Sequence, residues 1–191
     1  IHERLVGSEM CIRDSLYVRT PDGKTKDLTP GAKLKAQFAG WSGDDHGFFV
    51  QTNERDERFF DLYEYATDDY ARKLLYRNTD GYQLGPVSRD KRYVALVRPR
   101  TSNDADIFLY DGQSKKTTHI TKHTGNINYG PQAFAPDSLK LLITSDSGGE
   151  FATLQAHDIA SGKRSTVYSL PWDILGAGYS KGGKYLSLIH I

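Results

Sequence analysis

Residues 84–111 read LGPVSRDKRYVALVRPRTSNDADIFLYD. A short turn, Val87-Ser88-Arg89-Asp90, precedes two runs of β-forming residues, YVALVR (93–98) and DIFLYD (106–111). Apolar residues occupy successive positions in Ile107-Phe108-Leu109-Tyr110, so both faces of this strand are expected to be covered. The stretch therefore predicts strands of a sheet that lies between two neighbouring sheets. No segment of the chain shows a long apolar stripe of helical period, and helices are expected to be scarce.

The turn recurs along the chain at a nearly constant spacing. Its copies are Trp41-Ser42-Gly43-Asp44, Val87-Ser88-Arg89-Asp90, Phe134-Ala135-Pro136-Asp137 and Tyr179-Ser180-Lys181-Gly182. The second position falls at 42, 88, 135 and 180, which gives spacings of 46, 47 and 45 residues. Pro suits an early turn position because its φ is fixed, and Asp and Gly suit later ones through local hydrogen bonds or tolerance of positive φ.

Each turn is surrounded by strand candidates at similar offsets. Those after the turns are 47–52, 93–98, 139–144 and 184–186, then 59–65, 106–111 and 151–158, then 71–77, 116–121 and 163–169; those before the turns include 35–41 and 174–179. Four short strands per repeat of this length are typical of a β-propeller blade. The fold prediction is all-β: a partial β-propeller of about three and a half four-stranded blades, at about 16–33, 34–80, 81–126, 127–170 and 171–185. A β-sandwich of irregular strands is the weaker alternative, because it would not require the repeat.

Composition excludes several classes of protein. The 191 residues carry a net charge of +1, which gives no support to a nucleic-acid or anionic-membrane partner. No 18-residue apolar run is present, so no transmembrane helix is predicted. A single cysteine excludes an internal disulfide framework and a cysteine-based zinc site.

The two ends differ from the body of the chain. Residues 10–15, MCIRDS, can be encoded by ATGTGTATAAGAGACAG plus one base, and residues 186–191, LSLIHI, by CTGTCTCTTATACACATC. These DNA stretches are reverse complements and resemble the inverted transposon end used to fragment DNA for sequencing. We therefore expect residues 1–15 and 186–191 to be translated adaptor of non-native origin. On that expectation the native N-terminus is absent, and the compartment is left open between bacterial cytoplasm and periplasm.

The repeat resembles that of Tol-type translocation proteins and that of the N-terminal propeller of prolyl oligopeptidase-family serine peptidases. Longer stretches are more similar to the latter, namely TNERDERFFDLYEY (52–65), residues 84–111, SGGEFATLQAHDIASGKR (147–164) and PWDILGAGYSKGGKYL (171–186). They look like the bacterial dipeptidyl and acylaminoacyl peptidases. The resemblance implies a propeller that gates access for small peptides and helps to position them, with hydrolysis performed by a C-terminal α/β-hydrolase domain of the same parent chain.

The catalytic part of such a peptidase is not found in this sequence. The family places its serine in a G-x-S-x-G elbow, and no such motif occurs here. We therefore assign no catalytic, cofactor-binding or metal-binding residue, and expect the parent chain, not this stretch, to be the enzyme. The first alternative is a stand-alone Tol-type propeller for protein–protein binding. A lactonase-like propeller is a third, but the residues before the turns do not supply its acidic metal-binding set.

Four histidines and one acidic stretch of the body are candidate sites. Structural roles are expected for His46, His119, His123 and His157, because no motif supplies the oxyanion hole that nucleophilic catalysis requires. A metal site at His119 and His123 is disfavoured, since the local pattern predicts a strand and a turn. Asn103-Asp104-Ala105-Asp106 is interpreted as a strand-entry turn, because the glycine and distal glutamate of a calcium loop are missing.

The charged run Glu54-Arg55-Asp56-Glu57-Arg58 is expected to lie between two strands of one blade as a solvated loop. The alternative is that it faces the peptidase domain or the entry channel and positions a peptide terminus. In dipeptidyl peptidases a pair of propeller glutamates holds the free amino group of the substrate. Glu54, Glu57 and Glu150 are the glutamates that could be compared with that pair, but none lies in a matching motif, and the role is not transferred to them.

Overall fold

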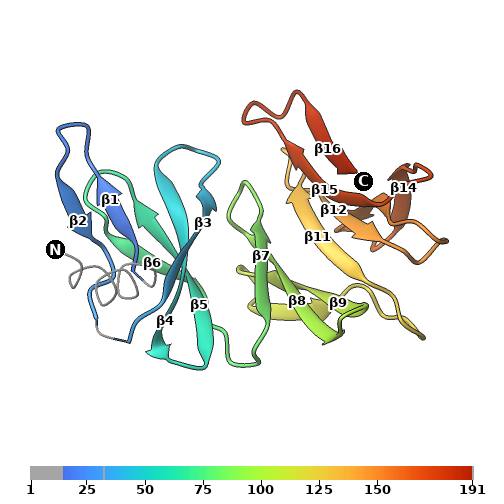
Figure 1. Ribbon diagram of the computed structural model, residues 1–191, viewed down its shortest axis with the longest axis horizontal. Helices are drawn as coiled ribbons and strands as arrows, with labels where there is room; N and C mark the ends of the chain where they lie inside the picture. Colours follow the sequence, from blue (N-terminus) through green and yellow to red (C-terminus); the bar gives the residue numbers. More distant parts are fainter. Residues whose placement is uncertain (1–14, 32, 191) are drawn as a thin grey trace, which may run out of the picture. The chain divides into compact units, whose positions relative to one another are not determined.

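The computed structural model describes residues 15–31 and 33–190, which form strands joined by turns and loops (Figure 1). The chain divides into two compact units, residues 1–81 and 82–191, and each is described by itself. Within the described ranges no helix is present that could cross a membrane.

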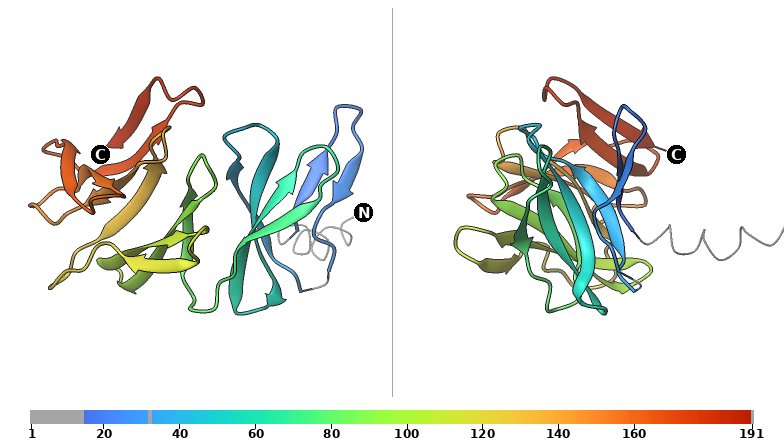
Figure 2. Two further views of the ribbon diagram at one scale, coloured as in Figure 1. Left: turned by 180° about the vertical axis from the view of Figure 1, so that it is seen from behind. Right: turned by 90° about the vertical axis from the view of Figure 1, so that its left-hand side faces the viewer.

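The first unit holds a two-stranded and a four-stranded antiparallel sheet (Figure 2). The small sheet pairs β1 (Tyr17–Arg19) with β2 (Thr25–Asp27). The larger sheet has the order β3-β4-β5-β6, formed by β3 (Ala36–Trp41), β4 (Gly47–Asp56), β5 (Phe59–Ala66) and β6 (Arg72–Tyr76). Its core consists of Ala36, Phe48, Val50 and Tyr65, with Phe48 stacked on Tyr65 at a ring-centroid distance of 5.5 Å.

The second unit holds two four-stranded antiparallel sheets and a further pair of strands. One sheet contains β7 (Gln83–Val87), β8 (Tyr93–Thr101), β9 (Asp104–Asp111) and β10 (Lys116–His119). The next contains β11 (Tyr129–Phe134), β12 (Lys140–Ser145), β13 (Thr153–Asp158) and β14 (Arg164–Tyr168), and the pair is β15 (Ile174–Tyr179) with β16 (Leu186–His190). Every sheet is a meander in which each strand pairs with the next in sequence, as the blade prediction requires.

The middle sheet of the second unit is covered on both faces. Leu141, Leu142 and Ile143 are consecutive in β12 and all are buried. Because side chains alternate between the faces of a strand, neighbours must pack in opposite directions. Leu141 and Ile143 join a core with Ala95 and Ile107 of the preceding sheet, whereas Leu142 packs with Ile174 of β15. In β9, for which covered faces were expected, Ile107 and Leu109 lie in the first of these cores, Tyr110 is buried, and Phe108 is half-buried against Tyr82.

The four predicted turns share one hydrogen-bond pattern. The residue at the second position donates its N–H to the carbonyl five residues later, at Ser42–Gly47, Ser88–Tyr93, Ala135–Lys140 and Ser180–Tyr185, with distances of 2.8–2.9 Å. The residue three positions after the N–H donor has positive φ in each copy, namely Asp45 (63°), Lys91 (62°), Ser138 (61°) and Gly183 (71°). The aspartates at the fourth turn position form local hydrogen bonds, as expected, because Asp44, Asp90 and Asp137 each accept from the N–H two residues later. The positive φ falls one residue after that position and is adopted by Lys91 and Ser138, so residue type does not determine it.

Strand bounds differ from the prediction mainly at two long hairpins. β4 continues to Asp56 and β8 to Thr101, although their apolar runs end at residues 52 and 98. Residues 186–190, which we propose to be adaptor-derived, form β16 and pair with β15; strand pairing does not reveal the origin of a sequence. The corresponding proposal for residues 1–15 falls, apart from Ser15, outside the described residues.

Candidate functional site: charged hairpins and an inter-blade groove

The charged run of the first unit is built into the β4–β5 hairpin. Glu54, Arg55 and Asp56 belong to β4, and only Glu57 and Arg58 form the turn. The prediction of a loop between two strands therefore holds for the last two residues only. The hairpin extends because the partners of the charged side chains lie on the same sheet.

Arg55 is held by a buried carboxylate. Its Nε and Nη2 atoms donate to the two oxygens of Asp61, at 2.6 and 2.8 Å, and Nη2 also donates to the Asn78 carbonyl at 2.7 Å. The Asn78 N–H donates to Asp61 Oδ1 at 2.7 Å. We call Arg55, Asp61 and Asn78 the Asp61 clasp. Since Asp61 is fully buried, these bonds supply the polar partners that a buried charge requires.

The other charges of the run are largely compensated. Glu54 pairs with Arg72 of β6, and Asp56 accepts two hydrogen bonds from the Arg58 guanidinium, which hold the pKa of the Asp56 carboxyl well below its usual range. Burial, followed by the nearby Glu54, raises the pKa of Tyr63 to about 12.

Glu57 and Glu150 are exposed, and neither has an ion pair within the described part of the chain. Glu54 is thus already engaged, and Glu57 is the glutamate of this run left open to another molecule.

The β8–β9 hairpin of the second unit repeats the clasp. Arg100 Nη2 lies 2.5 Å from Asp106 Oδ2, and six residues separate this pair just as six separate Arg55 from Asp61. Asp106 is almost completely buried. An arginine late in the second strand and an aspartate in the third therefore close both hairpins by the same charge-assisted contact.

Two histidines complete the surroundings of Asp106. His119 Nε2 lies 2.7 Å from Asp106 Oδ1, and the ring stacks on Phe108 at 4.3 Å. His123 places Nε2 at 2.9 Å from Asp104 Oδ1 and Nδ1 at 2.8 Å from the Thr121 carbonyl. The Thr121 carbonyl, then Asp104, raise the pKa of His123 against the opposing effect of burial. We call Asp104, Asp106, His119 and His123 the Asp106 cluster.

The Asp106 cluster is arranged for structure rather than for proton transfer. Both nitrogens of His123 face oxygen acceptors, so this imidazole has no free nitrogen with which to accept a proton from a nucleophile. No group of three or more acidic, histidine or cysteine side chains suited to a metal ion occurs among the residues described. Of the strand-entry turn expected at residues 103–106, only Asn103 lies in the turn, because β9 already begins at Asp104.

The pairing of the two histidines with Asp104 and Asp106 is not predictable from the sequence, because the partners are 13 and 19 residues apart and no motif links them. The Arg100–Asp106 contact has a sequence signal, since its spacing repeats that of Arg55 and Asp61. Of the other histidines, His46 lies in an exposed turn and His157 is buried in β13.

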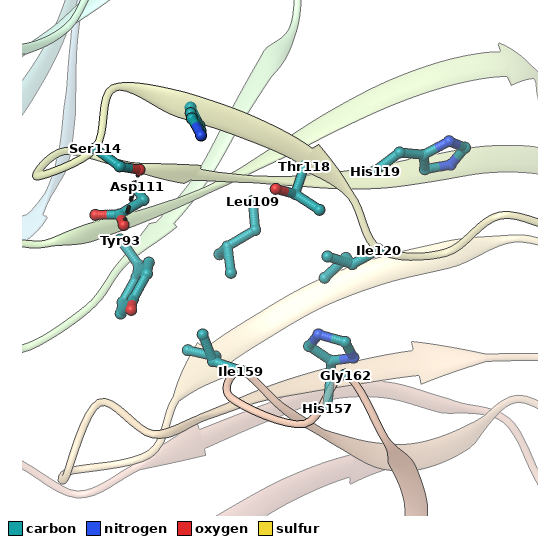
Figure 3. Close-up of a pocket in the computed structure, with 11 residues that line it drawn as sticks. Tyr93, Leu109, Asp111, Ser114, Thr118, His119, Ile120, His157, Ile159 and Gly162 are labelled. Carbon is teal, nitrogen blue, oxygen red and sulfur yellow. Dashed lines mark hydrogen bonds between the residues drawn. The ribbon is translucent and has the colours of Figure 1, made fainter.

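A second feature of the second unit is a groove between its two four-stranded sheets (Figure 3). The cavity measures about 400 Å³. One wall comes from β8, β9 and β10 and the loop after β9, and includes Leu109, Ser114, Lys116 and Thr118; the other comes from β13 and the turn after it, and includes His157, Ile159 and Gly162. We call this feature the β10–β13 groove. Figure 3 shows His157 and Ile159 opposite Leu109, Thr118 and Ile120.

Comparison with known proteins places these features in context. No protein-family model matches the chain. Dipeptidyl aminopeptidase BIII from Pseudoxanthomonas mexicana is 32% identical over 150 residues, which cover 76% of this chain and 21% of that relative. The chain is weakly homologous to this protein and spans about a fifth of its length.

Solved structures show the fold. TolB from Acinetobacter baumannii has a TM-score of 0.66 at 16% identity, and the match covers 93% of this chain and 43% of the TolB chain. A TolB-type structure from Agrobacterium tumefaciens has a TM-score of 0.66 at 15% identity, with coverage of 94% and 64%. A prolyl endopeptidase structure has a TM-score of 0.57 at 13% identity, with coverage of 94% and 36%. The predicted propeller fold is thereby confirmed. Sequence identities this low show the shared fold and do not indicate a shared activity.

Proposed function

We propose that this chain is part of the non-catalytic propeller of a serine peptidase, where it gates access and helps to position peptide substrates for a C-terminal α/β-hydrolase domain. The observation that carries the proposal is the 32% identity with a dipeptidyl aminopeptidase over 150 residues. The TolB-type structures resemble the chain at half that identity, which supports the shared fold only.

The geometry of the hairpins is compatible with a gate. A gate must keep its shape while peptides pass, and the Asp61 clasp and the Arg100–Asp106 pair fix the ends of two long hairpins through buried carboxylates that are paired with arginines. Buried carboxylates with several charge-assisted partners hold side chains in one arrangement. The exposed Glu57 at the tip of the β4–β5 hairpin is the group that could meet the amino group of a peptide.

The test uses the product of the complete native gene. We expect a fluorophosphonate probe to label one serine, and short peptides to be cleaved with a higher kcat/KM than long ones. Asp61→Ala, which loosens one hairpin, should reduce the difference in kcat/KM between short and long peptides. Asp56→Ala, which affects an exposed pair of the same hairpin, should leave that difference unchanged. Absence of serine labelling, or equal cleavage of short and long peptides, would contradict the proposal.

A further inference from the structure

The β10–β13 groove contains a buried polar atom without a partner. His157 is 3% exposed, and no described residue forms a hydrogen bond with its Nδ1 atom. Buried polar groups are nearly always paired, so an unpaired nitrogen beside a cavity calls for an explanation. Because His157 itself lines the groove, a molecule bound there would lie against the imidazole.

Two side chains of opposite charge line the groove, and only one of them is paired among the described residues. Its lining includes one carboxylate, Asp111, and one ammonium, Lys116. Asp111 is bound by both guanidinium nitrogens Nε and Nη2 of Arg92, at 2.9 Å each, and also accepts from the Ser114 hydroxyl at 3.0 Å. Arg92 accordingly holds the pKa of Asp111 well below its usual range. Lys116 has no ion pair within the described ranges, and its charge is therefore available to an anion.

The remainder of the groove combines apolar side chains with hydroxyls, and its size is limited. Leu109 and Ile120 line the wall formed by the β9–β10 sheet, and Ile159 faces them from the β13 side (Figure 3). Hydroxyls of Ser114 and Thr118 lie on the same wall as Lys116. A volume of about 400 Å³ falls at the lower end of the range of small-molecule sites and suits a ligand of one or two residues.

We propose that the β10–β13 groove binds a small aliphatic carboxylate, with its branched tail between Leu109, Ile120 and Ile159 and its carboxylate at Lys116. A neighbouring amide or carbonyl of the ligand hydrogen-bonds the His157 imidazole. The ligand chemistry has two sources, the C-terminal residue of a peptide and a free branched-chain acid. This inference is independent of the proposed peptidase function, because it rests on residues of the second unit alone.

The test is a titration of the 191-residue chain carrying ¹⁵N in its histidine side chains, followed by NMR. The probes are N-acetyl-L-leucine and 4-methylpentanoate, each compared with its neutral amide. We expect the signals of His157 to move on addition of an acid, and the acids to bind about tenfold more tightly than the amides, since the amide lacks the charge-assisted contact. The comparison of acid with amide on the unmodified chain makes the result independent of any variant.

Matched variants locate the anion. Lys116→Met should abolish the preference for acid over amide, while Lys115→Met, which changes an adjacent lysine outside the groove lining, should retain it. Tighter binding of N-acetyl-L-leucine than of 4-methylpentanoate would assign the ligand to peptide C-termini, and equal or tighter binding of 4-methylpentanoate to free acids. Equal binding of acids and amides, loss of preference in both lysine variants, or no shift of His157 at millimolar ligand would overturn the proposal.

Discussion

Replacing the buried carboxylate of the Asp61 clasp should strongly destabilise the first unit. Asp61→Ala removes the acceptor of three hydrogen bonds, two from the Arg55 guanidinium and one from the Asn78 N–H. Breaking a buried ion pair costs about 3–5 kcal/mol, because the remaining partners lose solvation without compensation. The Arg55 side chain is 24% exposed, so water can replace part of what it loses, and we expect the lower end, about 3 kcal/mol.

The assay is urea unfolding followed by the fluorescence of Trp41, which lies in the first unit and contacts Phe38 and Phe48. The second tryptophan, Trp172, is changed to Phe in every protein compared. With a urea dependence of about 1 kcal/mol per molar, the midpoint should fall by about 3 M. Asp56→Ala is the matched control, since its partner Arg58 is 72% exposed and its midpoint should hardly move. Equal midpoints for the two variants would refute the assignment of the clasp as a structural element.

Three further predictions concern the second unit. Gly183→Ala should lower the free energy of unfolding by more than about 1 kcal/mol, because Gly183 has a φ of +71° and an added Cβ would lie 2.5 Å from Pro136 Cγ. The control in thermal unfolding is Gly182→Ala, whose added Cβ meets nothing within 4 Å. His157→Phe should raise stability by about 1 kcal/mol by removing an unpaired buried nitrogen. Burial, then Arg164, lower the pKa of His157, so the unfolded state protonates this imidazole more readily than the folded state. The stability that His157→Phe adds should therefore grow as the pH falls below about 6.5, and an increase that stays constant with pH would contradict this. The pKa of His123 is raised, so the protonated side chain contributes fully to the free energy of unfolding below about pH 6.5, and this contribution is lost at higher pH. In urea unfolding, His123→Gln should therefore destabilise the protein more at about pH 5.5 than at about pH 8.5, and the reverse order would contradict this.

Local chemistry made the repeat predictable. The turns that begin at Trp41, Val87, Phe134 and Tyr179 depend on serine, proline, aspartate and glycine within a few residues, and neighbours in sequence determine their hydrogen bonds. Consecutive apolar residues in β9 indicated coverage on both faces, since an exposed face would have required polar alternation. Fold class and strand order followed from these two patterns.

Features that depend on distant partners could not be predicted in the same way. β4 extends through Asp56 because Glu54 and Arg55 find Arg72 and Asp61 on neighbouring strands, whereas the sequence shows only alternating charges. The Asp106 cluster depends on how the chain after β10 returns His123 to Asp104, across 19 residues. The β10–β13 groove requires two sheets to be brought together, and no motif within one repeat encodes it.

Native genomic DNA, read outward from the codons for residues 16 and 185, would show whether this propeller belongs to a serine peptidase. We predict that the downstream frame completes the propeller and continues into a domain with G-x-S-x-G followed by aspartate and histidine. We also predict that the codons for residues 1–15 and 186–191 are absent from the genome. A frame that closes the propeller and stops would contradict the peptidase assignment and favour a binding propeller.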